Sequence, residues 1–285
     1  MSRPWSSSSP ISLGSLWLSG KNRSVLTIRC YEIDCRQFLS WISENDLTVT
    51  HPAAITKSHF SEYLSSLSDQ GLSGRTRARK LAAIKEYFRF LIGSGSVTIS
   101  PAESMSAPKR ERNGRNYLTP EEYTRLLSLA GSNPRDYAIL QVFLQAGIRI
   151  SGLCSLTLSD TDLADRTLTI RQGKGMADRT IELEKKGSQA LRNHLQSRPQ
   201  SLSDALFLNY QAESISERGV QKLLAKYVKL AGITKKISPH SLRHTFATYK
   251  AERGVSPYQL QQWLGHRNLN TTRSMCILAS RTAGK

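Results

Sequence analysis

The sequence predicts a mainly α-helical protein of two domains, with a small antiparallel β-sheet in the second domain. Apolar residues recur at the three- and four-residue spacing of an amphipathic helix over much of the 285 residues. Two short segments instead alternate between apolar and polar residues, and a glycine-containing loop separates them. A basic stretch without periodicity divides the chain, whose length is sufficient for about two domains.

The charge balance points to a polyanionic partner. Lys and Arg number 40 and Asp and Glu number 22, so the formal net charge is +18. Nucleic acid is the commonest polyanion for so basic a chain, and the alternative is a basic surface without a partner. Hydrophobic residues make up 39% of the sequence, which excludes a wholly disordered protein. No apolar run reaches the roughly 18 residues of a membrane span.

The N-terminal residues and the cysteines carry little functional signal. Serines interrupt the apolar residues of segment 1–20, so we expect a partly disordered start and no signal peptide. The cysteines are scattered and lack the spacing of a zinc site. They predict reduced thiols in a cytosolic protein and no bound metal. These cysteines are Cys30, Cys35, Cys154 and Cys276.

The first domain is expected to contain helices over residues 24–42, 56–68 and 73–92. Thr56 is a suitable N-cap for the second of these helices. The first two turns of the third helix carry a basic cluster. Because side chains and free amides at a helix N-terminus can meet phosphates, we predict that this cluster contacts DNA; the alternative is a solvated charged face. The cluster consists of Arg75, Arg77, Arg79 and Lys80.

A linker is expected between the two domains. The helical pattern breaks at Gly93, and the next residues include Pro101, Pro108 and a run with four positive charges against one negative charge. We assign residues 106–116 to the linker. A basic linker can lie along a phosphate backbone, so both domains could hold one duplex. Its cations are Lys109, Arg110, Arg112 and Arg115.

The second domain begins at Thr119, where Pro and Glu follow at the positions of a capped helix start. Helical patterns follow over residues 120–130, 134–147 and 149–155. Segments 167–171 and 179–183 alternate and predict a β-hairpin across loop 172–178. Further helices are expected over 187–196, 215–230, 239–253 and 256–264, with a short helix after residue 271.

Two segments of this domain combine residue types that suit phosphate binding. His240 and Arg243 lie three residues apart on one face of a capped helix. Helix amides, an imidazole and a guanidinium then converge, as an anion site requires. Farther along, Gly265 ends a helix and leaves His266 on a turn. Taken singly, each of these residues could equally have a structural role.

A third segment places Arg149 after Gly147 within an apolar stretch. An arginine in apolar surroundings needs a partner, and a bound phosphate would serve. The alternative is a structural ion pair.

Together these segments resemble the tyrosine recombinase family, which includes the phage integrases and the Xer-type site-specific DNA recombinases. The resemblance covers nearly the whole chain. It implies a helical, SAM-like core-binding domain over residues 21–105 and a mostly helical catalytic domain over 117–285. The motifs that carry it, in chain order, are Gly147–Ser151, Gly173–Gly175, His240–Thr248 and Leu264–Thr272.

The resemblance also implies a role for each matching residue. Arg149 and Arg243 would clamp the scissile phosphate and stabilise its pentavalent transition state. Lys174 would protonate the leaving 5′-oxygen, and His240 would act as acid or base beside the nucleophile. His266 would donate a hydrogen bond to a phosphate oxygen. No metal or cofactor is implied, because a covalent 3′-phosphotyrosyl bond conserves the energy for rejoining.

The sequence departs from the family at the nucleophile. The family tyrosine is expected nine residues after His266, and this position is Met275, whose thioether has no ionisable proton. No tyrosine occurs after Tyr258. A second departure is Gly152, at a position where the family usually carries an acidic residue that we expect to support the site by hydrogen bonds.

Three explanations of the missing tyrosine remain open. The chain has lost strand cleavage, or the neighbouring Cys276 attacks instead, provided that nearby cations lower the pKa of its thiol. In the third explanation another tyrosine, Tyr249 or Tyr258, reaches the phosphate. The sequence favours a core position for Tyr249 and an exposed one for Tyr258.

The expected partner is a recombination site in double-stranded DNA, on which relatives assemble as dimers and tetramers, in some cases with a second recombinase. The expected location is the cytoplasm, at the nucleoid, without membrane contact. The leading alternative is a catalytically inactive accessory protein or regulator of recombination. An RNA-binding role is disfavoured, because no row of aromatic residues at sheet spacing suggests base stacking.

Overall fold

The computed structural model describes residues 24–108, 117–171 and 178–265. The chain forms two compact units, residues 1–113 and 114–285. Each unit has its own hydrophobic core. We describe each unit by itself.

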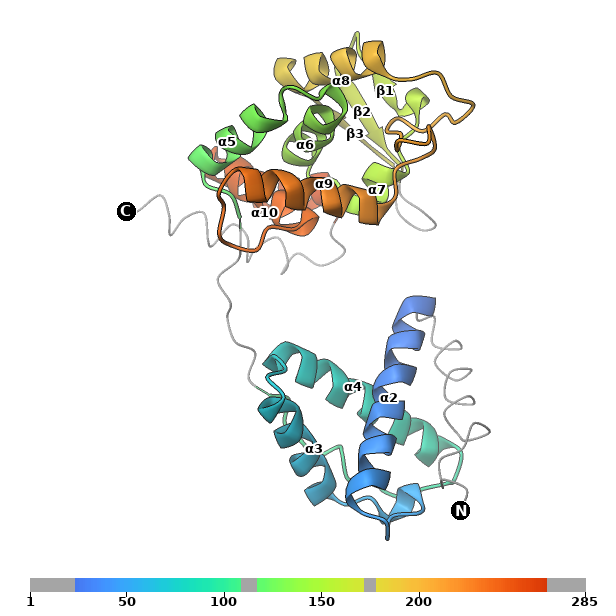
Figure 1. Cartoon of the computed structure of the whole chain (residues 1–285). Coiled ribbons are helices and arrows are strands. Elements are labelled where there is room, and N and C mark those ends of the chain that lie inside the picture. The colour runs from blue at the N-terminus through green and yellow to red at the C-terminus, as the bar shows by residue number, and fades with distance from the viewer. Residues whose placement is uncertain (1–23, 109–116, 172–177, 266–285) are drawn as a thin grey trace. The chain divides into compact units, whose positions relative to one another are not determined.

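The described part of the first unit contains three α-helices and a short 3-10 helix (Figure 1). The ring of Phe38 stacks on that of Phe60 at 5.0 Å, and Phe60 meets Phe88 edge-on at 5.6 Å. These rings come from three different helices, so aromatic packing joins all three. The three predicted helices are confirmed. They are α2 (Val25–Asn45), α3 (Lys57–Asp69) and α4 (Gly74–Gly93), with η1 (Pro52–Ala54) between the first two.

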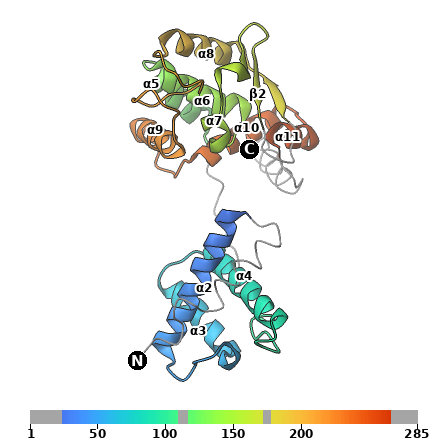
Figure 2. The ribbon, with the colours of Figure 1, turned by 90° about the vertical axis from the view of Figure 1, so that its right-hand side faces the viewer.

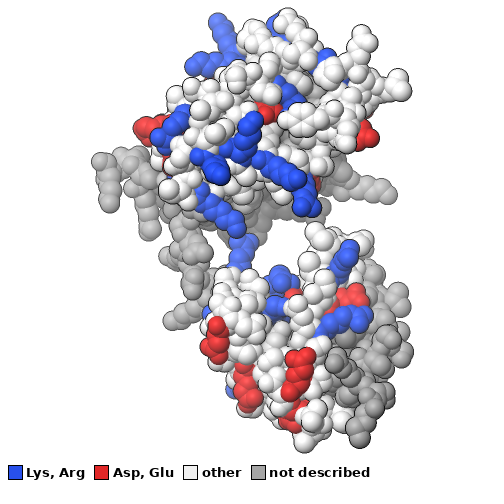
Figure 3. Space-filling model, viewed as in Figure 1, with Lys and Arg blue, Asp and Glu red and all other residues white. Residues whose placement is uncertain are grey.

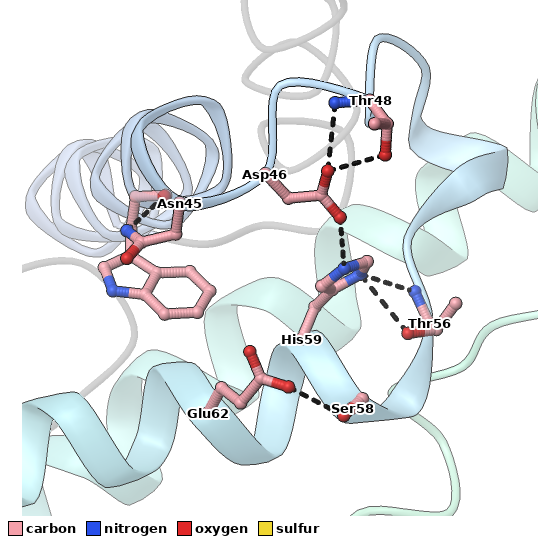
Figure 4. A network of polar contacts seen from close by, with 8 residues as sticks. Asn45, Asp46, Thr48, Thr56, Ser58, His59 and Glu62 are labelled. Atoms are coloured by element: carbon pink, nitrogen blue, oxygen red, sulfur yellow. Dashed lines mark hydrogen bonds and ion pairs between the residues drawn. The ribbon is translucent and has the colours of Figure 1, made fainter.

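A polar network around Asp46 fixes the connection from α2 to α3 (Figure 4). Asp46 accepts hydrogen bonds from the Thr48 amide at 2.9 Å and the Thr48 hydroxyl at 2.6 Å, and it lies 3.2 Å from Nε2 of His59. These hydrogen bonds, chiefly those from Thr48, lower the pKa of Asp46. Nδ1 of His59 accepts from the Thr56 amide at 3.0 Å, which completes the predicted cap of α3.

A buried ion cluster joins α2 to α4. Asp34 is 1% exposed and Lys80 is 5% exposed. The Lys80 ammonium lies 3.1 Å from Asp34 Oδ1 and also donates to Gln37, while Arg79 pairs with the other carboxylate oxygen. This placement corrects the prediction that Lys80 contacts DNA, because its ammonium is enclosed and already neutralised.

In the second unit, α6 (Pro134–Ala146) is the central helix (Figure 1). Every residue from Ala138 to Ala146 is buried, as expected of a helix that is covered on all sides. The helices that pack most extensively against it are α5 (Pro120–Ala130), α8 (Lys185–Ser197) and α10 (Pro239–Glu252). No described helix is long and apolar enough to cross a bilayer.

The remaining helices of this unit are α7 (Ile150–Cys154), α9 (Glu217–Leu230) and α11 (Pro257–Leu264), with the 3-10 helix η2 (Leu158–Asp160). Figure 2 shows α11 beside α10, and the two helices are in contact. The predicted capping box of Thr119 and Glu122 at the start of α5 is confirmed. The helix predicted after residue 271 lies outside the described residues.

The sheet of the second unit is antiparallel, with the strand order β1-β2-β3. The predicted hairpin is confirmed: β2 (Thr167–Ile170) pairs with β3 (Arg179–Glu182), so that Ile170 lies opposite Arg179. Strand β1 (Thr161–Asp162) was not predicted, because two residues are too few to show a periodic pattern.

The ion cluster of the first unit yields a stability prediction. Asp34→Asn leaves the buried Lys80 ammonium without its carboxylate, so we expect the free energy of unfolding to fall by about 3 kcal/mol. Urea unfolding followed by circular dichroism measures this change. The double variant Asp34→Asn/Lys80→Met removes the stranded charge and should recover part of the loss. Unchanged stability of Asp34→Asn would contradict the assignment.

Candidate active site

Arg243, on α10, is only 1% exposed although it carries a charge. Its guanidinium donates a hydrogen bond to the carbonyl of Gly147 at 2.6 Å and another to the carbonyl of Leu264. These carbonyls lie at the C-terminal ends of α6 and α11, where unpaired oxygens and the helix dipole favour a cation. Arg243 therefore joins the ends of two helices to a third.

Arg149 is the N-cap of α7, and its Nη2 donates to the carbonyl of Gly265 at 2.8 Å. Since Gly265 follows Leu264 directly, Arg149 and Arg243 bind consecutive carbonyls and lie next to each other. The structure thus brings together two of the predicted site residues. Arg149 is exposed, however, and not buried as its apolar neighbours suggested, because the chain turns outward after α6.

Gly147 makes this turn. It has a left-handed backbone with φ of 55°, and a Cβ atom there would lie 2.4 Å from the ring of Phe246. Only glycine fits this combination of backbone angle and close approach. The position of Arg149, two residues later, depends on it.

Arg179 is a third arginine in this region, and the sequence analysis did not select it. It begins β3 opposite Ile170, whose side chain is 3% exposed. Its Nε and Nη1 atoms are buried and have no hydrogen-bond partner among the described residues. One signal in the sequence could have revealed it: Arg179 is a charged residue at a core-facing position of an alternating strand, two residues before the buried Ile181.

Arg149 disfavours the charges of Arg179 and Arg243. Burial, followed by repulsion from Arg149, lowers the pKa of Arg179 to about 10. Burial, followed by repulsion from Arg149 and Arg179, lowers the pKa of Arg243 to about 9. Both values lie above neutral, so both groups stay protonated at pH 7. Among the described residues, no carboxylate forms an ion pair with any of the three, and the cluster is suited to bind an anion.

His240 lies in the first turn of α10, one turn before Arg243. Ser238 begins this helix by accepting a hydrogen bond from the Ser241 amide at 3.3 Å. The His240 side chain is exposed, and its ring lies edge-on to that of His244 with centroids 4.4 Å apart. An accessible imidazole thus stands at the N-terminal end of the helix that carries Arg243.

Other predicted site residues lie outside the described residues, so their roles stay predictions. Lys174 belongs to the segment between β2 and β3, and His266 follows Gly265 directly in the sequence. The positions 275 and 276, Met275 and Cys276, also lie outside, as do the linker cations Lys109, Arg110, Arg112 and Arg115.

The two alternative tyrosines occupy different environments. Tyr249 is half-buried, stacks on Tyr123 at 6.0 Å, and has the Arg253 guanidinium 4.7 Å from its ring centroid. These contacts hold its ring between α5 and the end of α10. Tyr258 is 66% exposed in the first turn of α11.

The basic cluster at the start of α4 is only partly available to a ligand. Arg75 is exposed and Arg77 is half-buried, whereas Arg79 already pairs with Asp34. Lys and Arg side chains also gather on the face of the second unit shown in Figure 3. Arg75 and Arg77 are therefore the members of the α4 cluster best placed to meet a phosphate.

The described residues contain no group of three His, Cys, Asp or Glu side chains that could hold a metal ion. Cys30, Cys35 and Cys154 are free thiols. Burial is the main cause that raises the pKa of Cys35 to about 12 and that of Cys154 to about 11. These two thiols are protonated at neutral pH and are poor nucleophiles.

Comparison with known proteins decides the family. Residues 116–275 match the phage integrase family, and residues 16–95 match the SAM-like N-terminal domain of phage integrases. The chain belongs to the tyrosine recombinase family. It is 34% identical over 248 residues to a tyrosine recombinase of Pseudothermotoga lettingae, which covers 86% of this chain and 85% of that protein. Enzymes of this family break and rejoin DNA strands.

Solved structures of other recombinases share the fold. The crystal structure of the XerA recombinase is 29% identical, with a TM-score of 0.58, over 96% of this chain and 95% of that one. A lambda integrase dimer bound to a COC′ core site is 19% identical, with a TM-score of 0.77, over 93% of each chain. The latter likeness shows the recombinase fold alone.

The different environments of the two arginines yield a second prediction. Arg243→Ala leaves two carbonyls without their donor and opens a cavity, so we expect it to destabilise the second unit by about 3 kcal/mol. Arg149→Ala removes an exposed side chain and should cost less than about 1 kcal/mol. Urea unfolding compares the two variants. Equal losses of stability would contradict the bridging role of Arg243.

Proposed function

We propose that this recombinase family member binds a specific site in duplex DNA and holds one phosphodiester between Arg149 and Arg243. One observation carries the proposal: these arginines, far apart in the sequence, bind the consecutive carbonyls of Leu264 and Gly265. Two adjacent guanidinium groups without a carboxylate can donate several charge-assisted hydrogen bonds to phosphate oxygens.

In the full family reaction, the same cations would stabilise a pentavalent phosphorus. The nucleophile forms a new bond to phosphorus, the bond to the 5′-oxygen breaks, and this oxygen takes up a proton. We assign the proton donor to Lys174 and the acid or base beside the nucleophile to His240. His266 would donate to a phosphate oxygen. The site would need no metal or cofactor, because the side chains supply the positive charge.

The residue at the nucleophile position determines whether this chain can cleave a DNA strand. Met275 stands at the expected tyrosine position, and a thioether cannot lose a proton to become a nucleophile. We infer that the chain occupies recombination sites without cutting them by its own tyrosine, as an accessory or regulatory member of the complex. Attack by the adjacent Cys276 is the second candidate. Tyr249 is disfavoured, because its stacking on Tyr123 holds the ring in place.

We base the proposed assembly of this chain on DNA on a solved structure of another recombinase. A lambda integrase has been solved as a dimer on its core site, and we propose the same association for this chain on DNA, with tetramers across two sites. A second recombinase would supply the missing tyrosine. The protein would act at the nucleoid in the cytoplasm.

Covalent capture tests the assignment of the nucleophile. The binding site is first selected from random-sequence duplexes, and a nicked version of it is incubated with the protein and run on a denaturing gel. We expect no adduct from the natural chain and an adduct from Met275→Tyr, because the phosphate site is already formed.

Each other result on this gel has a defined meaning. An adduct of the natural chain that Cys276→Ser abolishes would identify the cysteine as nucleophile. An adduct that survives Cys276→Ser would contradict both hypotheses, the absence of cleavage and attack by Cys276. Failure to select any DNA would contradict the proposed function itself.

The salt dependence of binding separates the linker from the site. Affinity should fall steeply with salt, because each neutralised phosphate releases counterions. Replacing the four linker cations by Gln should reduce the slope of log K against log [salt] by up to about 4, whereas Arg149→Ala should reduce it by about 1. Fluorescence anisotropy with a labelled duplex measures the slope. A salt-independent affinity would contradict phosphate binding. The linker cations are Lys109, Arg110, Arg112 and Arg115.

A further inference from the structure

Arg179 has buried hydrogen-bond donors for which the described residues supply no acceptor. It begins β3 on the face that carries the buried Ile181, opposite Ile170 in β2. Its Nε and Nη1 atoms are buried without a partner among the described residues. A buried donor without an acceptor is destabilising, and more so when it is charged. A ligand that accepts these hydrogen bonds would remove this cost.

The neighbours of Arg179 limit what that ligand can be. Arg149 lies close enough to disfavour the charge of Arg179, and Arg179 in turn disfavours the charge of Arg243. Segments 172–177 and 253–285 contain no Asp or Glu side chain. Asp178 precedes Arg179 but is exposed. An anion bound from solution would satisfy the buried donors of Arg179 and offset the positive charge around them.

Arg179 lies close to the proposed phosphate site. Ile170, the pairing partner of Arg179, would contact a Cβ atom placed on Gly152 at 3.9 Å. Gly152 belongs to α7, the short helix that Arg149 caps. Arg179 also directly follows the segment that contains Lys174. Arg179 thus lies near α7 through its partner Ile170, and in the sequence it follows the segment of Lys174.

We propose that Arg179 is a third phosphate-contacting arginine, which uses its buried Nε and Nη1 to bind the same phosphodiester as Arg149 and Arg243. This inference rests on the proposed function. In the absence of DNA, Arg149 disfavours the charges of the other two arginines, and Arg179 has no acceptor for Nε and Nη1 among the described residues. On DNA, one phosphate provides acceptors for all three. Arg179 therefore trades stability of the free protein for affinity.

The first test distinguishes this role from a structural one. Loss of a structural arginine would lower the melting temperature, whereas loss of Arg179 should raise it and weaken DNA binding. We expect Arg179→Gln to bind the selected duplex about tenfold more weakly and to raise the melting temperature of the free protein, since a buried unpaired charge is lost. Arg179→Lys should recover part of the affinity. The matched control is Arg192→Gln, which removes the same charge from an exposed position on α8 and should change neither quantity. A lower melting temperature with unchanged affinity would overturn the proposal.

A second measurement identifies the phosphate. A set of duplexes carries one neutral methylphosphonate each, and the affinities of the natural chain, Arg149→Ala and Arg179→Gln are compared on every duplex. If both arginines contact one phosphate, the penalties of both variants should largely disappear at the same position, because the charge that they recognise is gone. A penalty of Arg179→Gln that disappears at another position, or at none, would overturn the proposal.

The same scan keeps this inference separate from the proposed function. Should Arg149 couple to one phosphate while Arg179 couples to none, the proposed function stands and the role of Arg179 fails. Should neither arginine couple to any phosphate, the proposed function fails, and the inference with it. Circular dichroism of each variant confirms that a loss of affinity does not reflect unfolding.

Discussion

The second unit depends on one buried guanidinium. Arg243 binds carbonyls at the C-terminal ends of α6 and α11, and it thereby joins both helix ends to α10. Arg149 donates a hydrogen bond to the next carbonyl in the sequence, that of Gly265. The geometry of the anion site is thus set by the backbone of two helix ends. Backbone atoms of this kind are far less mobile than surface side chains, so the two arginines are placed before any ligand arrives.

This arrangement separates phosphate binding from strand cleavage. The described arginines come from elements before residue 265, whereas positions 275 and 276 follow them in the chain. The residue at position 275 is therefore not part of the elements that hold the described arginines. A protein of this kind can still recognise a strand and organise a complex, because phosphate contacts position a protein on DNA.

Most of the fold could be predicted, because caps and apolar periods are local signals. Buried ionic partners could not. Lys80 lies in the same basic cluster as Arg75, and nothing local shows that its partner, Asp34, comes from a helix 46 residues earlier. Arg149 was expected to be buried, yet its backbone turn brings it to the surface. Arg179 could not be predicted from the family motifs, because it lies outside them, and a charge at a core-facing strand position does not by itself indicate a function.

The contrast in burial between the two clamp arginines bears on how such a chain would evolve once cleavage is lost. Arg243 stabilises the fold by joining helix ends, so selection for folding alone would retain it through long genetic drift. The presence of Arg243 is therefore not evidence of catalytic activity. Arg149 is exposed, contributes little to the packing, and could be replaced at small cost to the fold. Under the proposed function, Arg149 is thus the residue whose retention would depend on DNA binding and not on folding.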